Sequence, residues 1–485
     1  MEQGLIESFR SIVGSEDAIT DQALITPYLF ENRRLFHGKS PLLLRPSSTK
    51  EVSLIMHLAS QTCTPIVPQG GNTGLVGAQL PDDSGHSVIL SMERLNKIRS
   101  LDLKDNFAVV EAGVILKTLQ KKADEMNRFF PLSLASEESC QIGGNLSSNA
   151  GGTGGLAYGN MRDLCLGLEV VLPDGRILDD LRFVKKDNSG YNLKDLFIGA
   201  EGTLGVITAA VLKLFPKPKG KEVALVGLDS PAKVVELLSL AQCHGGTLLT
   251  GFELMGKLSF QMALNYRMCS RSPLDHEHEW YVLINMSSSR SDNDALSALH
   301  IVLEMALKSS IIDDAVVAQS LKQQDFFWQL RESISPAQKL AGGSIKHDIA
   351  VPIASIPDFI AESALIVEEI IPGAQVVCFG HVGDGNLHYN ITQPVGADTA
   401  AFLKLWPKIT HHIHRLAIQY QGTFSAEHGI GQLKREELRT FKSSVSLEIM
   451  QEIKKIFDPL GIMNPGKKLK FKKNKYFTLK LYIIK

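Results

Sequence analysis

A chain of 485 residues is too long to bury a single hydrophobic core and predicts at least two domains. Its 44% hydrophobic and 21% charged residues are ordinary for a soluble globular protein, and no run of 18 apolar residues suggests a membrane-spanning helix. The net charge of −1 conceals an asymmetry: residues 467–485 hold eight Lys and no acid, whereas the rest has 43 basic against 52 acidic residues, an unfavourable balance for binding nucleic acid.

The two ends of the chain and its cysteines predict a cytoplasmic protein. Acids stand in MEQGLIESFR where a signal peptide has bases. The six cysteines are scattered without a CxxC pair, which is typical of reduced thiols and not of a disulfide framework. The basic tail, residues 470–485, mixes Lys with Phe, Tyr, Leu and Ile. This composition suits peripheral contact with the inner face of a membrane, with an incidental extension as the alternative.

The first half of the chain predicts short strands that alternate with helices. Residues 1–39 form a helical segment in which apolar residues recur at helical spacing. A strand is expected at 41–44, a helix with a capped start at 48–61, and another short strand at 65–68. The last strand leads directly into the glycine-rich loop 69–77.

Three glycine-rich loops, at 69–77, 139–159 and 199–207, carry the chemical signal of this half. The first has four glycines in eight residues, and such a turn can direct successive N–H groups at a phosphate. It lacks the Gly-Lys-Ser/Thr ending of a Walker loop and does not begin a helix as a Rossmann fingerprint does. The small residues of the other two let the backbone lie against a flat ligand. Together the loops predict a dinucleotide site.

Residues 40–217 resemble the FAD-binding domain of the vanillyl-alcohol oxidase / p-cresol methylhydroxylase superfamily. Three motifs carry the resemblance: residues 68–77, the stretch IGGNLSSNAGG and the stretch IGAEGTLGVIT. The resemblance implies an α+β fold whose two subdomains hold FAD between them. No His lies in the first loop, so the FAD is expected to be non-covalent. The cofactor-binding residues that the resemblance implies, one of them far along the chain, are Pro68, Gly70, Gly71, Asn72, Thr73, Gly74, Leu75, Gly143, Asn145, Ser148, Asn149, Gly151, Glu201, Gly205, Ile207 and Asn464.

A boundary at Pro216–Gly220 separates this domain from a second α+β domain, residues 218–469. Its alternating pattern predicts an antiparallel sheet with helices on one face, and the C-terminal helices are expected to return to the FAD domain. Arg331 and Ser335 lie four residues apart and so share a helix face, where Arg can bind a carboxylate; a surface ion pair is the alternative. The helical spacing of residues 411, 412 and 414 predicts that these three His occupy a solvated face.

The stretch VVCFGHVGDGNLHYNI, residues 376–391, predicts a β-hairpin. A type I′ turn at Asp384-Gly385 would place His381 directly opposite His388, with Asn390 on the same face. Directly opposed residues have Cβ atoms about 4.5–5.5 Å apart, close enough for two imidazoles to share a divalent ion. Two half-buried histidines without a metal are the alternative.

SAEHGIG, residues 425–431, places an acid beside a base between glycines. With FGHVGDGNLHYN and NPGK, it makes the second domain similar to that of the D-2-hydroxyglutarate dehydrogenase / D-lactate dehydrogenase / glycolate oxidase group. The resemblance covers residues 20–469. It implies His381, His388 and Glu427 as metal ligands, His428 as the catalytic base, and Arg331, Ser335, Lys346 and Asn390 as substrate-binding residues.

The resemblance implies oxidation of a D-2-hydroxy acid, and Arg331 with Lys346, which together could bind two carboxylates, favours D-2-hydroxyglutarate. Two His and a carboxylate leave an open position on Zn²⁺, or on Mn²⁺ or Fe²⁺, for the substrate hydroxyl. The base removes the hydroxyl proton, and FAD accepts the hydride. The alternatives are a D-lactate dehydrogenase, a glycolate oxidase flavin subunit, or a flavin-binding subunit without chemistry of its own. A quinone, an electron-transfer flavoprotein or a cytochrome is the expected electron acceptor, and a homodimer is a further expectation.

The motifs depart from the group pattern in three places. Glu138 and Ala78 stand where Gly is frequent, and Ser335 stands where Thr is common in the hydroxyglutarate enzymes. Ser335 keeps the hydroxyl but weakens the choice of substrate. Glu138 either perturbs flavin binding or points to solvent.

Overall fold

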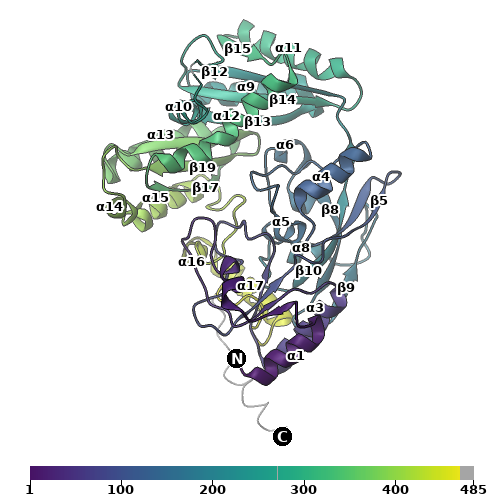
Figure 1. Cartoon of the computed structure of the whole chain (residues 1–485). Helices are drawn as coiled ribbons and strands as arrows, with labels where there is room; N and C mark the ends of the chain where they lie inside the picture. Colours follow the sequence, from purple (N-terminus) through teal and green to yellow (C-terminus); the bar gives the residue numbers. More distant parts are fainter. Residues whose placement is uncertain (270, 470–485) are drawn as a thin grey trace.

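The computed structural model describes residues 1–269 and 271–469, so the basic tail lies outside the described residues. The chain forms two lobes (Figure 1). The lower lobe contains the N-terminal half together with the last helices of the chain, α16 (Arg435–Phe441) and α17 (Ser444–Phe457). The upper lobe contains a large sheet with helices packed on it.

Two larger sheets and the two-stranded sheet of β7 (Arg128–Phe129) and β11 (Phe215–Pro216) build the described part of the lower lobe. The first has the order β1-β2-β4-β3, with β2 and β3 parallel to β4; its strands are β1 (Ala18–Ile19), β2 (Leu43–Leu44), β3 (Ile66–Gln69) and β4 (Val88–Ser91). Helices α1 (Gln3–Val13) and α3 (Thr49–Thr62) pack beside it, and the Ser48 side chain caps α3 as expected.

The second sheet is antiparallel and has the order β5-β6-β10-β8-β9. Its strands are β5 (Ile98–Asp102), β6 (Phe107–Glu111), β8 (Cys165–Val171), β9 (Ile177–Asp180) and β10 (Val206–Lys213). Helices α4 (Leu116–Glu125) and α5 (Ile142–Ser148) bury apolar residues against it. The short elements of the lobe are α2 (Gln22–Ile25), α6 (Gly155–Tyr158), α7 (Met161–Leu164), α8 (Lys194–Phe197), β7 (Arg128–Phe129) and β11 (Phe215–Pro216).

The upper sheet is antiparallel, with the order β15-β12-β14-β13-β18-β19-β16 and with β17 also paired to β19. Its strands are β12 (Gly220–Leu228), β13 (Leu249–Gly256), β14 (Trp280–Ser288), β15 (Asp314–Val317), β16 (Ser344–Ile345), β17 (Asp348–Ala350), β18 (Gln375–His381) and β19 (Asn386–Thr392). The predicted α+β class and antiparallel sheet are therefore confirmed.

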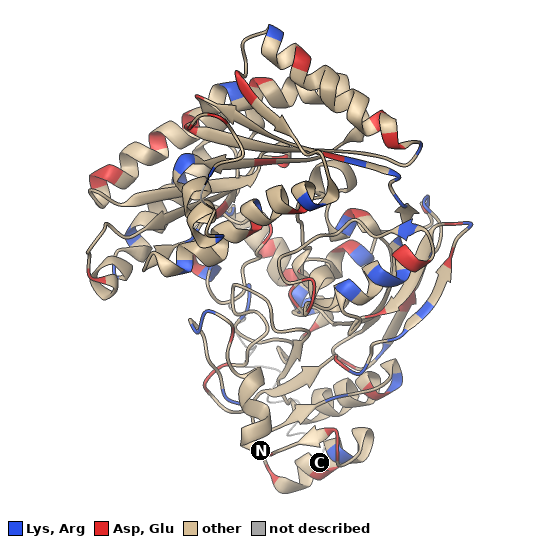
Figure 2. Ribbon diagram, turned by 45° about the horizontal axis from the view of Figure 1, so that its top comes forward, with Lys and Arg blue, Asp and Glu red and all other residues tan. Residues whose placement is uncertain are grey.

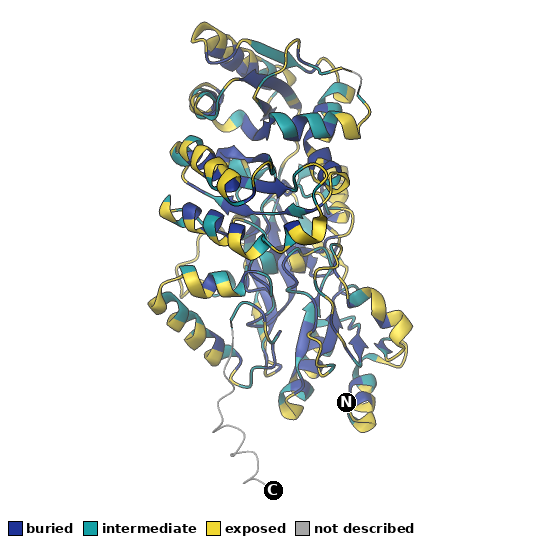
Figure 3. Cartoon of the chain, turned by 90° about the vertical axis from the view of Figure 1, so that its left-hand side faces the viewer, coloured by how far each residue is buried: buried dark blue, intermediate teal, exposed yellow. Residues whose placement is uncertain are grey.

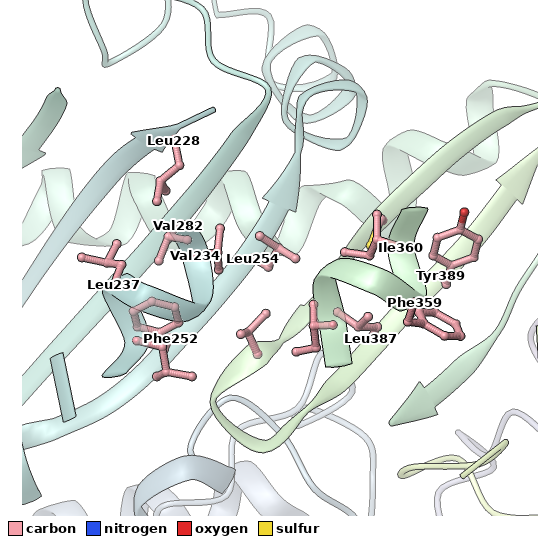
Figure 4. Packing of buried hydrophobic residues seen from close by; sticks show 14 of the residues in the cluster. Leu228, Val234, Leu237, Phe252, Leu254, Val282, Phe359, Ile360, Leu387 and Tyr389 are labelled. Atoms are coloured by element: carbon pink, nitrogen blue, oxygen red, sulfur yellow. The ribbon is translucent and has the colours of Figure 1, made fainter. Parts of the chain in front are cut away.

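Helices cover both faces of this sheet, so the prediction of helices on one face was wrong. Helices α9 (Pro231–Gly245), α11 (Asp292–Lys308), α13 (Ile356–Ile370) and α15 (Trp406–Gln419) share one core, part of which Figure 4 shows around Phe252, Phe359 and Tyr389. Helices α10 (Lys257–Tyr266) and α12 (Leu321–Leu340) pack on the opposite face, and α14 (Thr399–Leu403) precedes α15. The reason lies in the unbroken apolar run 223–228, which contributes to both cores, as a strand buried on both faces must.

Burial and charge follow the layers. The central strands are buried, whereas the outer helices expose one side (Figure 3). Lys and Arg are interspersed with Asp and Glu along the helices of both lobes (Figure 2). Within the described ranges, no helix combines the length and apolarity that a bilayer crossing needs.

The end of the described chain joins the lower lobe. Met463 forms a β-bridge with Ile66, and the ring of Phe457 on α17 lies 5.3 Å from that of Phe197. The segment between α15 and α16 therefore crosses from the upper lobe to the lower lobe, and it carries Glu427 and His428.

Candidate active site

The three glycine-rich loops meet around one cleft, whose empty volume is about 880 Å³ with the solvent at its mouth included. His428 lines the same cleft. The predicted cofactor residues that line it are Pro68, Gly70, Gly71, Asn72, Thr73, Gly74, Gly143, Asn145, Ser148, Glu201, Gly205 and Ile207. Loops far apart in the sequence therefore surround a single space.

Polar atoms in this cleft lack partners within the described protein. Gln69 Oε1, Gln79 Oε1, Gln141 Oε1 and Asn145 Nδ2 are buried without a hydrogen bond. Buried polar atoms are normally bonded, so these four indicate a polar ligand, and the hydroxyls, phosphates and ring nitrogens of FAD fit this requirement. The three glutamines were not predicted as cofactor residues, although Gln69 and Gln141 lie within loops 69–77 and 139–159, because the resemblance assigns roles to other positions of these loops.

Four predicted cofactor residues, Leu75, Asn149, Gly151 and Asn464, do not line the cleft. A Cβ at Gly151 would lie 3.1 Å from Glu427 Oε2, so the missing side chain lets this loop approach Glu427 closely. Asn464 Nδ2 donates to the carbonyl oxygens of Ala78 (2.9 Å) and Glu201 (2.7 Å). In this structure Gly151 and Asn464 hold the surroundings of the cleft together.

Glu201 connects the cleft to the loop of the predicted base. Its side chain is buried, and the carboxylate accepts N–H groups from Ile430 (2.7 Å) and Gly431 (3.0 and 3.1 Å). These residues follow His428 in the same loop. A side chain of the third glycine-rich motif thus determines where His428 lies.

The hairpin of residues 375–392 differs from the predicted type I′ turn. Val382–Asp384 form a 3₁₀ turn, and of the predicted turn pair Gly385 has a positive φ (81°) but Asp384 does not. His388 consequently pairs with Phe379 and not with His381, a shift of two residues. Because strand side chains alternate with a period of two, both His stay on one face as diagonal neighbours, with ring centroids 5.5 Å apart.

The carboxylate of Glu427 meets both imidazoles. Its Oε1 lies 3.3 Å from His381 Nε2 and 3.6 Å from His388 Nε2. Ligand atoms placed 2.0–2.2 Å from a tetrahedral ion are separated by roughly 3.3–3.6 Å. The geometry therefore has the dimensions of a divalent metal site. A second group of described residues, Asp348, His388 and His428, also brings its ligand atoms within 4.8 Å of one another.

Glu253 on β13 lies behind this group and was missed in the sequence. It is 1% exposed; one oxygen accepts a hydrogen bond from His381 Nδ1 (2.7 Å), and the other accepts from Arg331 Nε (2.9 Å) and lies 2.8 Å from Arg331 Nη2 in an ion pair. The contact to Nδ1 leaves His381 Nε2 free to face Glu427. The available signal was a single acid inside the otherwise apolar strand LTGFELMG.

The carboxylates set opposite pKa shifts on the two imidazoles. Burial alone would lower the pKa of His381, but Glu253 and Glu427 raise it to about 10. Burial lowers the pKa of His388 to about 3, because the attraction of Glu427 is offset by the charge of His381. The pKa of Glu427 is lowered: burial opposes the shift, but the two imidazoles outweigh it. An anionic carboxylate facing one neutral imidazole suits a cation.

Asp348 on β17 orients His428 and was also missed. Its Oδ2 accepts the backbone N–H of His428 (2.8 Å) and lies 3.6 Å from His428 Nδ1 and 3.8 Å from Lys434 Nζ. Burial lowers the pKa of His428, and Asp348 only partly opposes this effect. His428 is therefore a neutral imidazole held at its Nδ1 side, with Nε2 free to accept a proton.

The predicted substrate residues lie on elements around this group, with different surroundings. Arg331 is buried on Glu253, and Ser335 lies one turn later on α12 and is exposed. Lys346, between β16 and β17, is half-buried without an ion pair among the described residues. Asn390 is buried; its amide donates to Gln338 Oε1 and accepts from the His347 N–H.

Two other sequence expectations have clear outcomes. His414 is not on a solvated face: it is buried in the core beside His347, and neither ring nitrogen has a hydrogen-bond partner among the described residues. Glu138 points to solvent, with a side chain that is 79% exposed and 3.9 Å from Lys117. Glu138 therefore leaves the cleft unperturbed.

Comparisons with known proteins identify the family to which the chain belongs. Residues 40–180 match the FAD binding domain family, and residues 217–468 match the C-terminal domain of FAD linked oxidases. By fold the chain is similar to p-cresol methylhydroxylase (TM-score 0.76, 16% identity, covering 96% of this chain and 97% of that one) and to alkyldihydroxyacetonephosphate synthase (TM-score 0.73, 18% identity, 96% and 85%). The chain thus belongs to the FAD-linked oxidases.

Within that family, curated relatives place the chain more narrowly. It is 35% identical to a mitochondrial D-2-hydroxyglutarate dehydrogenase of Arabidopsis thaliana, over 96% of this chain and 81% of that protein. It is 34% identical to a D-2-hydroxyglutarate–pyruvate transhydrogenase of Saccharomyces cerevisiae, over 95% and 93%. The chain belongs to the D-2-hydroxyglutarate dehydrogenase group, and the resemblance inferred from its motifs is confirmed.

Proposed function

We propose that this chain is an FAD- and divalent-metal-dependent dehydrogenase that oxidises a D-2-hydroxy acid, D-2-hydroxyglutarate in the first place, to the 2-oxo acid. The observation that carries the proposal is the position of His428. It lines the cleft of the glycine-rich loops, and its ring stacks 5.8 Å from that of His388. A base thus stands between the cofactor cleft and the three metal-ligand candidates. The names of the relatives support the choice of substrate.

His381, His388 and Glu427 would hold the metal, with Zn²⁺ preferred and Mn²⁺ or Fe²⁺ as alternatives. Such an ion polarises an alcohol oxygen and lowers the pKa of the hydroxyl. Glu253 supports the site by fixing the His381 tautomer, as carboxylates behind metal-bound histidines commonly do. The ligand set leaves a coordination position for the substrate.

The protein residues have separate proposed roles: one accepts the proton, others bind the substrate carboxylates, and others hold FAD. His428 accepts the hydroxyl proton at Nε2, and Asp348 holds the opposite side of the ring. Lys346, Arg331, Ser335 and Asn390 are proposed to bind and orient the carboxylates. The residues lining the cleft hold non-covalent FAD, which when bound supplies the hydride acceptor.

Four further expectations complete the proposal. A quinone, an electron-transfer flavoprotein or a cytochrome takes the electrons onward. Homodimer formation and a cytoplasmic location remain predictions, as does the membrane contact of residues 470–485. The relatives from Arabidopsis thaliana and Danio rerio are named mitochondrial, so the compartment of this chain needs its own test.

The proposed activity is tested with purified holoenzyme, a dye acceptor and a panel of D- and L-2-hydroxy acids. We expect D-2-hydroxyglutarate to bleach the flavin absorbance and to have the highest kcat/KM. A preference for D-lactate or glycolate would favour the alternatives within this enzyme group. Turnover of L-isomers alone, or no bleaching with metal present, would contradict the proposal.

Lys346 predicts a dependence of KM on pH. Burial, together with the charges of Arg33 and Lys339, lowers the pKa of Lys346 to about 8. The ammonium group is therefore charged below that pH and is lost above it, so KM for D-2-hydroxyglutarate should rise above pH 8 while kcat changes less. Lys346→Arg, which stays charged, should delay this rise to higher pH. A KM that rises equally in both enzymes would remove Lys346 from the binding site.

A further inference from the structure

The two cations proposed to bind substrate carboxylates, Arg331 and Lys346, are not equally available, because Arg331 already forms an ion pair within the protein. Two nitrogens of the Arg331 guanidinium contact the buried Glu253, so much of its charge is used within the protein. Lys346 has no ion pair among the described residues. A substrate with two carboxylates carries one more negative charge than a monocarboxylate, and its binding calls for a further cation beside Lys346.

Arg33, from the N-terminal segment, has this property. Its side chain is 17% exposed, and Nε and Nη2 are buried without a hydrogen-bond partner. The nearest acid, Glu31, lies 3.9 Å from Nε, but its oxygens already accept the N–H groups of Arg33, Leu35 and Phe36. Buried guanidinium N–H groups that lack hydrogen bonds are costly unless a ligand accepts them.

Residues 76–77 contact both the segment that carries Arg33 and the loop that carries His428. A Cβ at Gly77 would lie 2.8 Å from the ring of Phe36, three residues after Arg33. On the other side, Val76 accepts the N–H of Gln432, four residues after His428. The pKa of Lys346 is lowered mainly by burial and next by the charge of Arg33, as expected for two cations in one region of the protein.

We propose that Arg33 is a specificity-determining residue that, together with Lys346, binds the distal carboxylate of a 2-hydroxy dicarboxylate. Two donor nitrogens of the planar Arg33 guanidinium, Nε and Nη2, lack hydrogen bonds, and their geometry suits the two oxygens of a carboxylate. The inference rests on the proposed function for the reacting end of the substrate, and it adds the group that recognises the far end.

The test compares two substrates that differ only at the far end. D-2-hydroxyglutarate ends in a carboxylate, and D-2-hydroxyvalerate, of the same chain length, ends in a methyl group. Arg33→Met should lower kcat/KM for D-2-hydroxyglutarate by about 10- to 100-fold, mainly through KM, and leave D-2-hydroxyvalerate unchanged or improved. Arg33→Lys should restore part of the loss. Arg34→Met, at the exposed neighbouring position, is the matched control.

A binding measurement keeps the inference separate from the proposed function. Titrating oxidised holoenzyme with 2-oxoglutarate and 2-oxovalerate, followed by flavin absorbance, should show a preference for the diacid that Arg33→Met abolishes. If the wild-type enzyme fails to oxidise D-2-hydroxy acids, the proposed function is wrong, but the titration still tests whether Arg33 binds the distal carboxylate. Equal losses for both ligands, no loss, or the same loss in Arg34→Met would overturn the role of Arg33.

Discussion

His428→Asn should slow the reduction of FAD by D-2-hydroxyglutarate by about 10²- to 10⁴-fold, the range typical of a lost general base. The reason is that His428, neutral because burial lowers its pKa, stands between the cofactor cleft and the metal-ligand candidates. FAD content should remain near the wild-type value, because the side chain is one of many that line the cleft. Anaerobic stopped-flow reduction, with the flavin content measured in parallel, separates the two effects.

His300→Asn is the matched control, since His300 is exposed on α11 in the upper lobe. It should reduce FAD at the wild-type rate. Unchanged reduction in His428→Asn would remove the base from the mechanism and favour a flavin-binding subunit without chemistry of its own.

If Glu427 holds the proposed divalent metal, Glu427→Gln should abolish metal binding and lower kcat by at least about 100-fold. Glu427 Oε1 is the atom that both His381 Nε2 and His388 Nε2 approach, so an amide there loses the anionic ligand and weakens the whole group. Metal content by mass spectrometry, and activity with and without added Zn²⁺, Mn²⁺ or Fe²⁺, are the measurements. Glu448→Gln, at an exposed position on α17, should retain both.

The same experiment distinguishes the two candidate ligand groups. If Asp348, His388 and His428 held the ion, Glu427→Gln would keep its metal and Asp348→Asn would lose it. In that case His428 would be a ligand and could not act as the base. Retention of metal by Glu427→Gln would therefore overturn both assignments.

Features encoded within a few consecutive residues could be predicted from the sequence. The glycine-rich loops, the shared face of His381 and His388, and the adjacent Glu427 and His428 are such features. Glu253 and Arg33 could not be predicted in this way, because each reaches the site from a segment distant in the chain: Glu253 lies 128 residues from His381. A lone acid in an apolar strand shows that a buried partner exists but does not identify the partner.

Register and layering required tertiary information. The Asp384-Gly385 pair signals a turn, but the 3₁₀ turn before it shifts the pairing by two residues. Because the shift is an even number of residues, His381 and His388 remain on the same face of the hairpin. The prediction that they lie close together therefore holds although the predicted register was wrong. Helices on the second face of the upper sheet depend on which strands lie at its centre, and the sequence pattern alone does not establish strand order.

The hydrogen bonds from Ile430 and Gly431 to Glu201 join the third glycine-rich loop to the loop that carries His428, so we expect cofactor retention and substrate affinity to depend on each other. Any ligand that orders the third glycine-rich loop also restricts the loop that carries His428. Coupling between two sites is reciprocal in free energy. In the apoprotein, the position of His428 should therefore be less restricted. Tightly bound substrate should in turn slow the dissociation of FAD during turnover.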